Sequence, residues 1–360
     1  MTQRTTAAAS GQGAAGTAVP AQGPSRGRAS GGKRAAWLLA AVVVLALLVG
    51  ASLVIGARGL DLATVWQALF DFDPADGDHA VVHARIPRTV LGLLAGGALG
   101  LAGAAMQGVA RNPLADPGIM GVNAGAALAV VTGIYVFGIA TFTGYIWFAF
   151  VGAAVAAVVV YLVASLGREG ATPVKLALAG AALSAGLFSL MNVILVSSQD
   201  TLDRFRFWQV GGIAGRDWSV IQPGLPFLAV GALIVLLTGR ILNNLALGDD
   251  IARGLGMRVG LSRAATALGV VLLTGSATAL AGPIGFVGLV IPHAVRFFTG
   301  PDYRWILPFS LVVAPMLVLA ADIIGRVVLL PGEVPAGIMT ALVGAPVFVW
   351  LIRRGKGAGL

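Results

Sequence analysis

The sequence predicts an all-α fold, a polytopic membrane bundle of about ten transmembrane helices. Of the 360 residues, 58% are hydrophobic and 11% are charged, and the mean hydropathy is +0.91. Soluble domains carry about a quarter charged residues, so one or two buried cores could not hide this much apolar surface. Successive apolar runs also approach the roughly 20 residues that a helix needs to cross a bilayer. The chain is therefore expected to have lipid as its solvent.

The N-terminal segment, residues 1–34, predicts a disordered tail, because Ala, Gly, Ser, Thr and Gln dominate it and cannot pack a core. The apolar run near 35–57 is too long for the hydrophobic region of a signal peptide and lacks a convincing cleavage site. It is interpreted as a retained first span. The membrane domain is expected to cover 35–353, with a short C-terminal tail at 354–360.

Nine further spans are expected, separated by short polar interruptions. They lie near residues 88–109, 121–138, 145–166, 175–196, 224–239, 263–281, 284–299, 305–326 and 336–352. The run from Gly282 to Phe298 is short for a full crossing and contains Pro283 and Pro292. Its helix is therefore expected to be kinked or shielded by neighbouring helices.

The distribution of basic residues predicts that both termini are cytoplasmic. With the N-terminus inside and ten alternating spans, 17 of the 24 Lys and Arg residues fall in inner segments. Nine of the 15 acidic residues fall in outer segments. The net charge of +9 is thus a topology signal, and nucleic-acid binding is not needed to explain it.

Glycine accounts for 51 residues, and Gly92, Gly96 and Gly100 recur at every fourth position. Small residues at this spacing let two helix backbones approach closely in a bilayer. The pattern fits either a seam between two subunits or tight packing inside one subunit. The second interpretation is favoured, because every compact ten-helix bundle needs such seams.

Motifs for catalysis are missing from the sequence. It contains no phosphate-binding loop of the G-x4-G-K-[ST] type, no H-E-x-x-H and no G-x-S-x-G. Without cysteine it can form neither a disulfide nor a thiolate zinc site. His79 and His83 have the spacing of a helical metal pair, but their polar surroundings favour a solvated loop. The chain is therefore expected to be no enzyme and to hold no metal or other cofactor.

The predicted spans are also poor in acidic residues. Carriers driven by protons or sodium usually place Asp, Glu or His within their helices. Here Asp322 alone qualifies, and Arg326 one turn further along favours a local ion pair. A proton-coupled secondary carrier is thus a less favoured alternative, and a membrane-embedded enzyme or structural subunit less favoured still. A transporter whose spans lack ion-coupling groups is expected to draw its energy from another polypeptide.

From about Arg85 to Trp350 the sequence carries a series of motifs. They are Arg85-Ile-Pro-Arg88, Gly103-Ala-Ala-Met-Gln-Gly108, Arg111-Asn-Pro-Leu-Ala-Asp-Pro-Gly118, Phe207-Trp-Gln-Val-Gly-Gly212 with Trp218, Leu247-Gly-Asp-Asp-Ile-Ala-Arg-Gly-Leu-Gly256, Ala281-Gly-Pro-Ile-Gly-Phe-Val-Gly-Leu-Val-Ile-Pro-His293, Ala321-Asp-Ile-Ile-Gly-Arg326 and Gly344-Ala-Pro-Val-Phe348. In this combination and order the chain resembles the FecCD/BtuC-type permease family of ABC importers.

The resemblance implies a non-catalytic permease subunit in the bacterial cytoplasmic (plasma) membrane. A second permease, identical or related, would complete the translocation pathway. Two cytoplasmic ATPase subunits would bind ATP and Mg, and an extracytoplasmic solute-binding protein would deliver the substrate. The implied cargo is an iron-siderophore, with haem and cobalamin as the other substrate types of the family.

The resemblance also implies roles for three groups of residues. Docking of the binding protein would fall to Arg85, Arg88 and Arg326, for which membrane-interface anchoring is the plainer alternative. The inner constriction would include Asn112, Leu114 and Thr172, although Pro173 after Thr172 departs from the pattern. Coupling to the ATPases would fall to Leu247, Gly248, Asp249, Asp250, Arg253 and Gly256, in a form that only partly matches the EAA loop of the wider ABC importers.

The polar loop near 241–260 has features of its own that suit coupling. Asp249 and Asp250 fit the positive N-terminal end of a short helix, and Arg253 fits its C-terminal half. Leu255 and Met257 would give that helix an apolar face. An amphipathic helix at the inner surface could lie in a groove of a soluble partner, whereas the plainer alternative is an inert connector.

Overall fold

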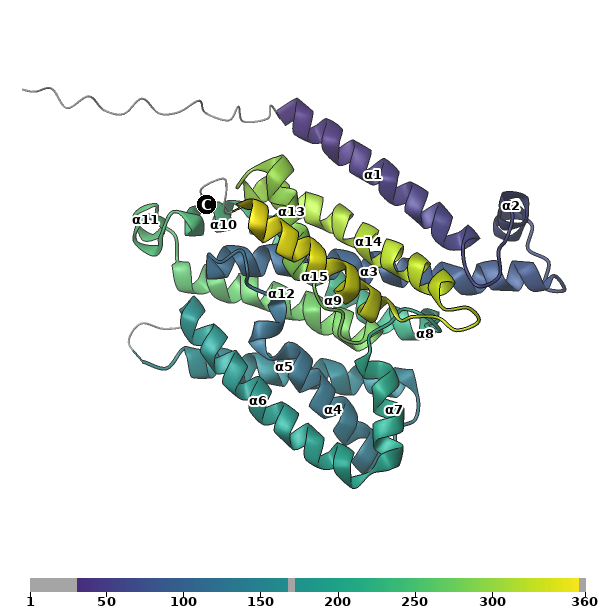
Figure 1. Ribbon diagram of the computed structural model, residues 1–360. Helices are drawn as coiled ribbons and strands as arrows, with labels where there is room; N and C mark the ends of the chain where they lie inside the picture. Colours follow the sequence, from purple (N-terminus) through teal and green to yellow (C-terminus); the bar gives the residue numbers. More distant parts are fainter. Residues whose placement is uncertain (1–30, 168–171, 356–360) are drawn as a thin grey trace, which may run out of the picture.

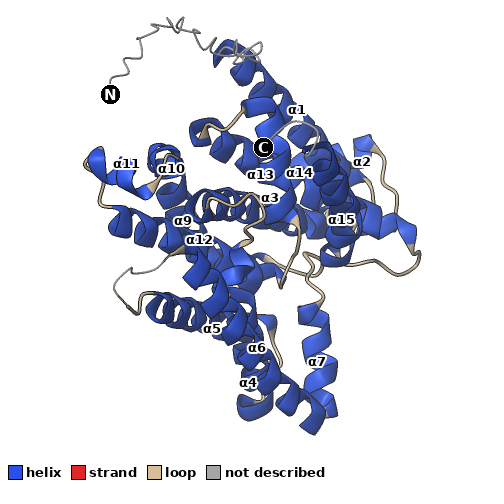
Figure 2. Cartoon of the chain, turned by 60° about the vertical axis from the view of Figure 1, so that its left-hand side comes forward, coloured by secondary structure: helices blue, strands red, loops and turns tan. Residues whose placement is uncertain are grey.

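The computed structural model describes residues 31–167 and 172–355. Within these ranges the regular secondary structure is helical throughout, without a β-strand (Figure 2). The first helix begins at Gly31, a few residues before the predicted start of the first span. Most of the two predicted tails lies outside the described residues.

Seven helical segments are long and apolar enough to cross a membrane. They are α1 (Gly31–Val54), α3 (Gly77–Ala110), α5 (Phe142–Ala164), α6 (Pro173–Ser197), the segment Trp218–Leu237, α12 (Val259–Ala281) and α14 (Tyr303–Val328). Shorter apolar helices are α4 (Val122–Phe137), α13 (Val287–Thr299) and α15 (Ala336–Gly355). The all-α prediction is confirmed for the described residues. Seven of the predicted spans match the long segments and three match the shorter helices, so the number of ten crossings stays a prediction.

The segment Trp218–Leu237 is composite, and short helices fill several of the connections. It consists of α8 (Trp218–Ile221), the 3-10 turn η2 (Gln222–Gly224) and α9 (Leu225–Leu237). The short connecting elements are α2 (Leu62–Phe70), η1 (Pro117–Met120), α7 (Gln199–Gln209), α10 (Gly239–Ala246) and α11 (Asp249–Gly254). Neither α2 nor α7 was expected from the sequence, because both are far shorter than a membrane span.

Helix α3 forms the centre of the bundle. It packs against α14, α12 and α13 and is the most deeply buried of the long apolar helices. It begins at Gly77, where the side chain of Asp76 accepts a hydrogen bond from the N–H of Asp78. The predicted span began only at residue 88, because the first turns of α3 carry charged and polar side chains.

Small residues place α3 directly against its neighbours. A β-carbon at Gly103 would overlap the carbonyl of Gly288 on α13, and one at Gly96 would overlap the backbone of Pro315 on α14. The predicted Gly/Ala seam therefore packs inside one chain, as favoured from the sequence. The contacts with α3, α14 and α15 also shield the short helix α13.

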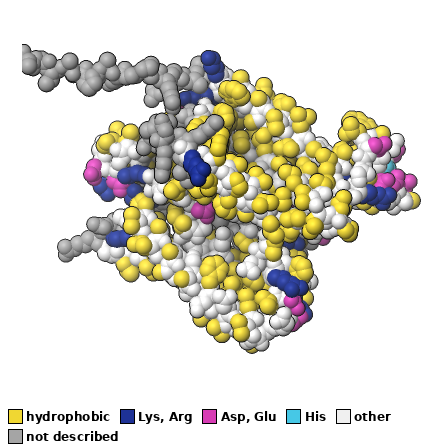
Figure 3. Space-filling view, viewed as in Figure 1, with side chains coloured by type: hydrophobic (Ala, Val, Ile, Leu, Met, Phe, Trp, Pro, Cys, Tyr) yellow, Lys and Arg dark blue, Asp and Glu magenta, His cyan; other side chains and the backbone are white. Residues whose placement is uncertain are grey.

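The helices run roughly side by side between two ends of the molecule (Figure 1). Helices α10 and α11 lie at one end, together with the start of α1 and the finish of α15; we call this the inner end. Helix α2, α8 and the connection from α14 to α15 lie at the other, outer end. Charged side chains gather toward these ends, and hydrophobic side chains cover the surface between them (Figure 3).

Candidate functional site

The three arginines predicted to dock a binding protein lie together at the outer end. Arg85 and Arg88 are on α3, and Arg326 is near the end of α14. Arg88 and Arg326 both bind Asp322, which is 1% exposed, so a single carboxylate joins the two helices. The local ion pair expected between Asp322 and Arg326 is confirmed. We call these four residues the arginine cluster.

Arg326 uses its remaining hydrogen bonds to hold the end of α1. It is 1% exposed, and it donates to the carbonyls of Ser52 at 2.6 Å and Ile55 at 3.1 Å. Another nitrogen of its guanidinium donates to the hydroxyl of Ser52 at 3.0 Å. The side chain is thus fully engaged within the chain.

Arg85 is also buried, and it binds backbone carbonyls at the end of α1 and in the connection after it. It donates to the carbonyls of Leu53, Val54 and Arg58 at 2.6–2.9 Å. Its exposed fraction is 8%. Arg85 and Arg326 together tie the connection after α1 to the bundle, which is a structural role that the sequence motif does not reveal.

Arg88 is the member of the arginine cluster that also binds a surface carboxylate. One of its nitrogens lies 2.8 Å from Asp322, and another lies 2.7 Å from Glu333 in the connection between α14 and α15. Glu333 is partly exposed. The side chain of Arg88 is itself 12% exposed, so all three predicted docking arginines are largely buried.

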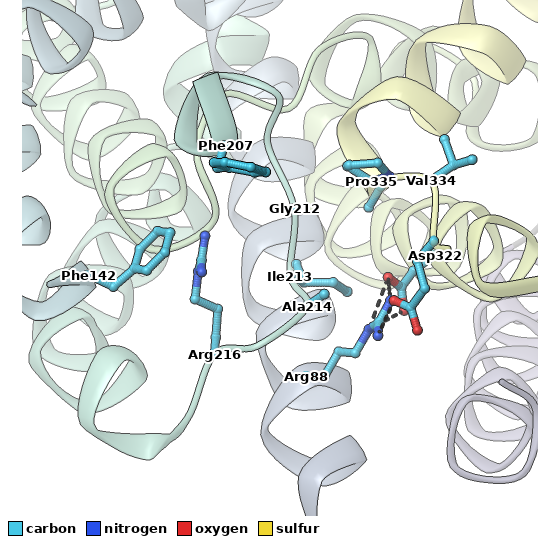
Figure 4. Close-up of a pocket in the computed structure, with 12 residues that line it drawn as sticks. Arg88, Phe142, Phe207, Gly212, Ile213, Ala214, Arg216, Asp322, Val334 and Pro335 are labelled. Atoms are coloured by element: carbon cyan, nitrogen blue, oxygen red, sulfur yellow. Dashed lines mark hydrogen bonds and ion pairs between the residues drawn. The ribbon is translucent and has the colours of Figure 1, made fainter. Parts of the chain in front are cut away.

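A pocket opens beside Arg88 at the outer end (Figure 4). Its volume is about 330 Å³. Its walls come from α3, the start of α5, the end of α7, the loop that follows α7, and the connection between α14 and α15. Charged groups in the wall are Arg88, Arg216, Asp322 and Glu333, and the aromatic residues are Phe142 and Phe207.

At the inner end, α11 and the residues that flank it expose apolar side chains, with Ile251 on the helix and Leu247 and Leu255 on either side of it. Leu247, Ile251 and Leu255 are 55–61% exposed, and they follow one another at a spacing of four residues. We call these three residues the α11 apolar stripe. Met257, expected on this face, instead packs against the core. Positive φ angles at Gly248 (115°) and Gly256 (79°) explain the glycines on either side of α11.

Asp249 links α11 to the bundle. It lies between Arg111, which follows α3, and Arg263 on α12, whose guanidinium is 2.9 Å from the carboxylate. Burial and the positive charge of Arg263 lower the pKa of Arg111, so the carboxylate offsets repulsion between two cations. Asp250 instead makes an exposed pair with Arg253 at 2.8 Å.

The predicted constriction residues lie at the inner end. Asn112 follows Arg111, and its side chain accepts a hydrogen bond from the N–H of Leu114 at 2.9 Å. Leu114 is 51% exposed. Thr172 caps α6 by accepting from the N–H of Lys175. The unexpected Pro173 is the first residue of that helix, a position that proline favours.

The described residues contain no group of three His, Cys, Asp or Glu side chains that could hold a metal ion. His79 accepts a hydrogen bond from the N–H of Asp73 and is 5% exposed. His83 bonds to the carbonyl of Ala68 on α2. Both histidines lie on α3 rather than in the solvated loop expected from the sequence, and they connect α3 to α2 and its flanking loop.

Comparison with known proteins identifies the class to which this fold and these residues belong. Residues 43–354 match the FecCD transport family. The match covers most of the chain, which therefore belongs to this family.

Individual relatives agree with this assignment. The ferric enterobactin transport system permease protein FepD of Escherichia coli is 45% identical over 314 residues, which are 87% of this chain and 93% of FepD. The iron(3+)-hydroxamate import system permease protein FhuB of Bacillus subtilis is 41% identical over 318 residues, 88% of this chain and 83% of FhuB. A solved inward-facing structure of a metal-chelate type ABC transporter has a TM-score of 0.78 at 28% identity, covering 89% and 99% of the two chains.

Several residues of these sites could not be found from the sequence. Glu333 contacts Arg88 from a position more than 240 residues away in the chain, and Arg263 reaches Asp249 from a different helix. Neither pair lies within one helix, so a helical period cannot connect its members. Ile251 could have been found, because it lies four residues from both Leu247 and Leu255.

Proposed function

We propose that this chain is the permease subunit of an ATP-driven importer of iron-siderophores. The observation that carries the proposal is the 45% identity to FepD across 93% of that permease, at a length that leaves no large part of either chain unmatched. The names of FepD and FhuB favour an iron chelate over the haem and cobalamin alternatives. A second permease, identical or related, would complete the pathway.

The α11 apolar stripe is the proposed contact for a cytoplasmic ATPase subunit. Its three side chains are exposed, and α11 lies at the inner end of the molecule (Figure 1). An exposed apolar ridge of this kind suits a groove in a soluble partner. The ATPase would bind ATP and Mg and supply the energy, since this chain has no nucleotide-binding motif.

Asp249 is the proposed link from the ATPase contact to the pathway. It binds Arg111, and Arg111 directly precedes Asn112 and the exposed Leu114. A displacement of α11 would therefore pull on the loop that carries two of the three constriction residues. Contiguous ion pairs and packed helices are the physical means by which such a displacement spreads.

The outer end is the proposed docking surface for a solute-binding protein. Among the cluster arginines, Arg88 is the one that also binds a partly exposed carboxylate, Glu333. Arg85 and Arg326 would act indirectly, by holding the backbone after α1 in place. Charged contacts of this kind set the rate and register of docking more than its affinity.

The excess of basic residues in the predicted inner segments supports a topology in which the inner end and both termini face the bacterial cytoplasm. The chain would then be a multi-pass protein of the cytoplasmic membrane. A binding protein would approach from outside and the ATPases from inside.

Co-purification tests the proposal. The full-length chain is expressed together with an ATPase encoded by a neighbouring gene, extracted in detergent and captured by a tag. The ATPase should remain bound, should be lost on deletion of residues 244–258, and should be weakened by Ile251→Ala. Leu162→Ala is the matched control, since Leu162 is similarly exposed but lies on α5, one of the long apolar helices. An ATPase that stays bound to the deletion variant would contradict the coupling assignment.

A further inference from the structure

Arg216 is a buried arginine without an acidic partner. Its exposed fraction is 8%, and its Nε donates to the carbonyl of Leu280 at 3.3 Å. Its guanidinium carbon lies 3.2 Å from the centre of the Phe142 ring. Among the described residues, no carboxylate forms an ion pair with it, and its two terminal nitrogens donate to no protein acceptor.

A buried cation in this state is costly, and the fold retains it. Burial lowers the pKa of Arg216 to about 10, so the guanidinium remains charged at neutral pH. The other buried arginines at the outer end bond their terminal nitrogens to carboxylates or carbonyls, whereas Arg216 bonds only its Nε to a described residue. Within the described part of the chain, Arg216 therefore keeps the donors of its two terminal nitrogens free, and these nitrogens are not sealed inside the core.

The free donors of Arg216 face the pocket at the outer end. The residue lines the pocket, and in Figure 4 its guanidinium lies between the rings of Phe142 and Phe207. The acidic groups of the opposite wall, Asp322 and Glu333, are bound to Arg88. The pocket thus has one unpaired positive charge and no unpaired negative charge.

We propose that Arg216, Phe142 and Phe207 form a binding site for an anionic, oxygen-bearing arm of the transported ferric chelate. A guanidinium matches a carboxylate or an adjacent pair of oxygens through two parallel hydrogen bonds, and aromatic walls suit the flat parts of such a ligand. A volume of about 330 Å³ accommodates one arm of a chelate rather than the whole. The inference rests on the proposed function and names the chemistry by which this chain would select its cargo.

The site can be tested through the charge that it presents. Since the chain has no cysteine, Ala214→Cys places a single thiol in the pocket wall. Right-side-out membrane vesicles containing the full-length variant are treated with a sulfonate-bearing or a trimethylammonium-bearing methanethiosulfonate of similar size. Ala75→Cys is the control, because its exposed loop carries Asp73 and Asp76. The sulfonate reagent should be favoured at residue 214 and disfavoured at residue 75.

Arg216→Gln in the Ala214→Cys background should lower the sulfonate-to-ammonium rate ratio by about tenfold, as expected for loss of one unpaired charge nearby. Arg216→Lys should preserve the preference. If the ratio is unchanged in a folded Arg216→Gln variant, the proposal is wrong. If that variant does not fold, the protection measurement below decides alone.

Protection of the thiol identifies the ligand. Ferric citrate, an anionic chelate, should slow labelling at residue 214, and a cationic ferric trihydroxamate should not. Equal protection by iron-free citrate, or no protection by ferric citrate, would overturn the assignment to a chelate. Labelling requires no transport, so a failure here with an ATPase still co-purifying refutes the site alone. Loss of the ATPase with protection intact would refute the proposed function instead.

Discussion

Arg326 carries a full charge in a place that is almost closed to water. Its stability depends on complete hydrogen bonding: Asp322 neutralises the charge, and the end of α1 supplies the remaining acceptors. A buried ion pair of this type adds little to stability over an apolar packing, but removing one partner is costly because the other charge is left behind. Arg326 thus holds the end of α1 against α14.

We expect Arg326→Ala to destabilise the protein by about 3–5 kcal/mol, because Asp322 then loses one of its two cations and the carbonyls of Ser52 and Ile55 lose their donor. Thermal unfolding in detergent, followed by size-exclusion chromatography, measures the change. Arg204→Ala is the control: Arg204 makes an exposed pair with Asp200 on α7, and its loss should have little effect. Equal stability of the two variants would show that the buried cluster does not hold α1 against α14.

The sequence predicted these arginines as a group but not what they touch. The motif named Arg85, Arg88 and Arg326, and the helical spacing predicted the pair between Asp322 and Arg326. Arg88 and Asp322 are separated by 234 positions, and no local period connects them. Arg216 could not be singled out for a related reason. Only the structure shows that no described carboxylate lies close enough to pair with it.

At the level of helices, α11 is held by one of its two adjacent acidic residues. Asp249 is partly buried between Arg111 and Arg263, whereas the side chain of Asp250 is almost fully exposed. Neighbouring residues of the same chemistry therefore have different tasks, because successive positions on a helix point in different directions.

We expect Asp249→Asn to reduce transport while the ATPase remains bound, because the α11 apolar stripe is intact but the link to Arg111 is weakened. ATP hydrolysis and chelate uptake are measured on the same proteoliposomes. The amount of chelate taken up per ATP hydrolysed should fall about tenfold, which corresponds to a loss of roughly 1.4 kcal/mol of coupling free energy. Asp250→Asn should behave like the unaltered protein. The same loss in both variants would point to a general effect of charge on α11.

The close approach of α3 and α13 gives a second prediction for the helices. Gly103→Ala should destabilise the bundle by about 3 kcal/mol or more, since the added methyl group meets the carbonyl of Gly288 and the helices must separate. Gly186→Ala on α6 is the control, because nothing lies within 4 Å of its added methyl group. That variant should be neutral or slightly stabilised, as expected for alanine in a helix. Thermal unfolding of both variants in detergent checks this.

The long apolar helices could be predicted from the sequence, whereas the short connecting helices α2 and α7 could not. An apolar run of about 20 residues predicts a membrane-spanning helix, because in lipid each backbone N–H and C=O group must form its hydrogen bond within the helix. The unpredicted α2 and α7 owe their starts to caps, in which Asp61 and Ser198 accept from N–H groups of the first turn. Such short helices depend on contacts that only the fold provides.

For the molecule as a whole, composition predicted the environment and the absence of catalytic motifs predicted the need for partners. Its two ends are the surfaces that partners could reach: one with an exposed apolar stripe, the other with arginines around a pocket. The lipid-covered middle carries large exposed apolar side chains on α5 and α6. The arrangement fits a passive path whose energy and cargo arrive from opposite sides.

Uptake of a radioactive ferric chelate into proteoliposomes tests this account most directly. The vesicles contain this chain, its partner permease and the ATPase subunits, with binding protein added outside. The chelate should accumulate only with ATP on the ATPase side, and accumulation should continue when a protonophore abolishes the proton gradient. Accumulation by this chain alone, driven by a proton gradient without ATP, would contradict it.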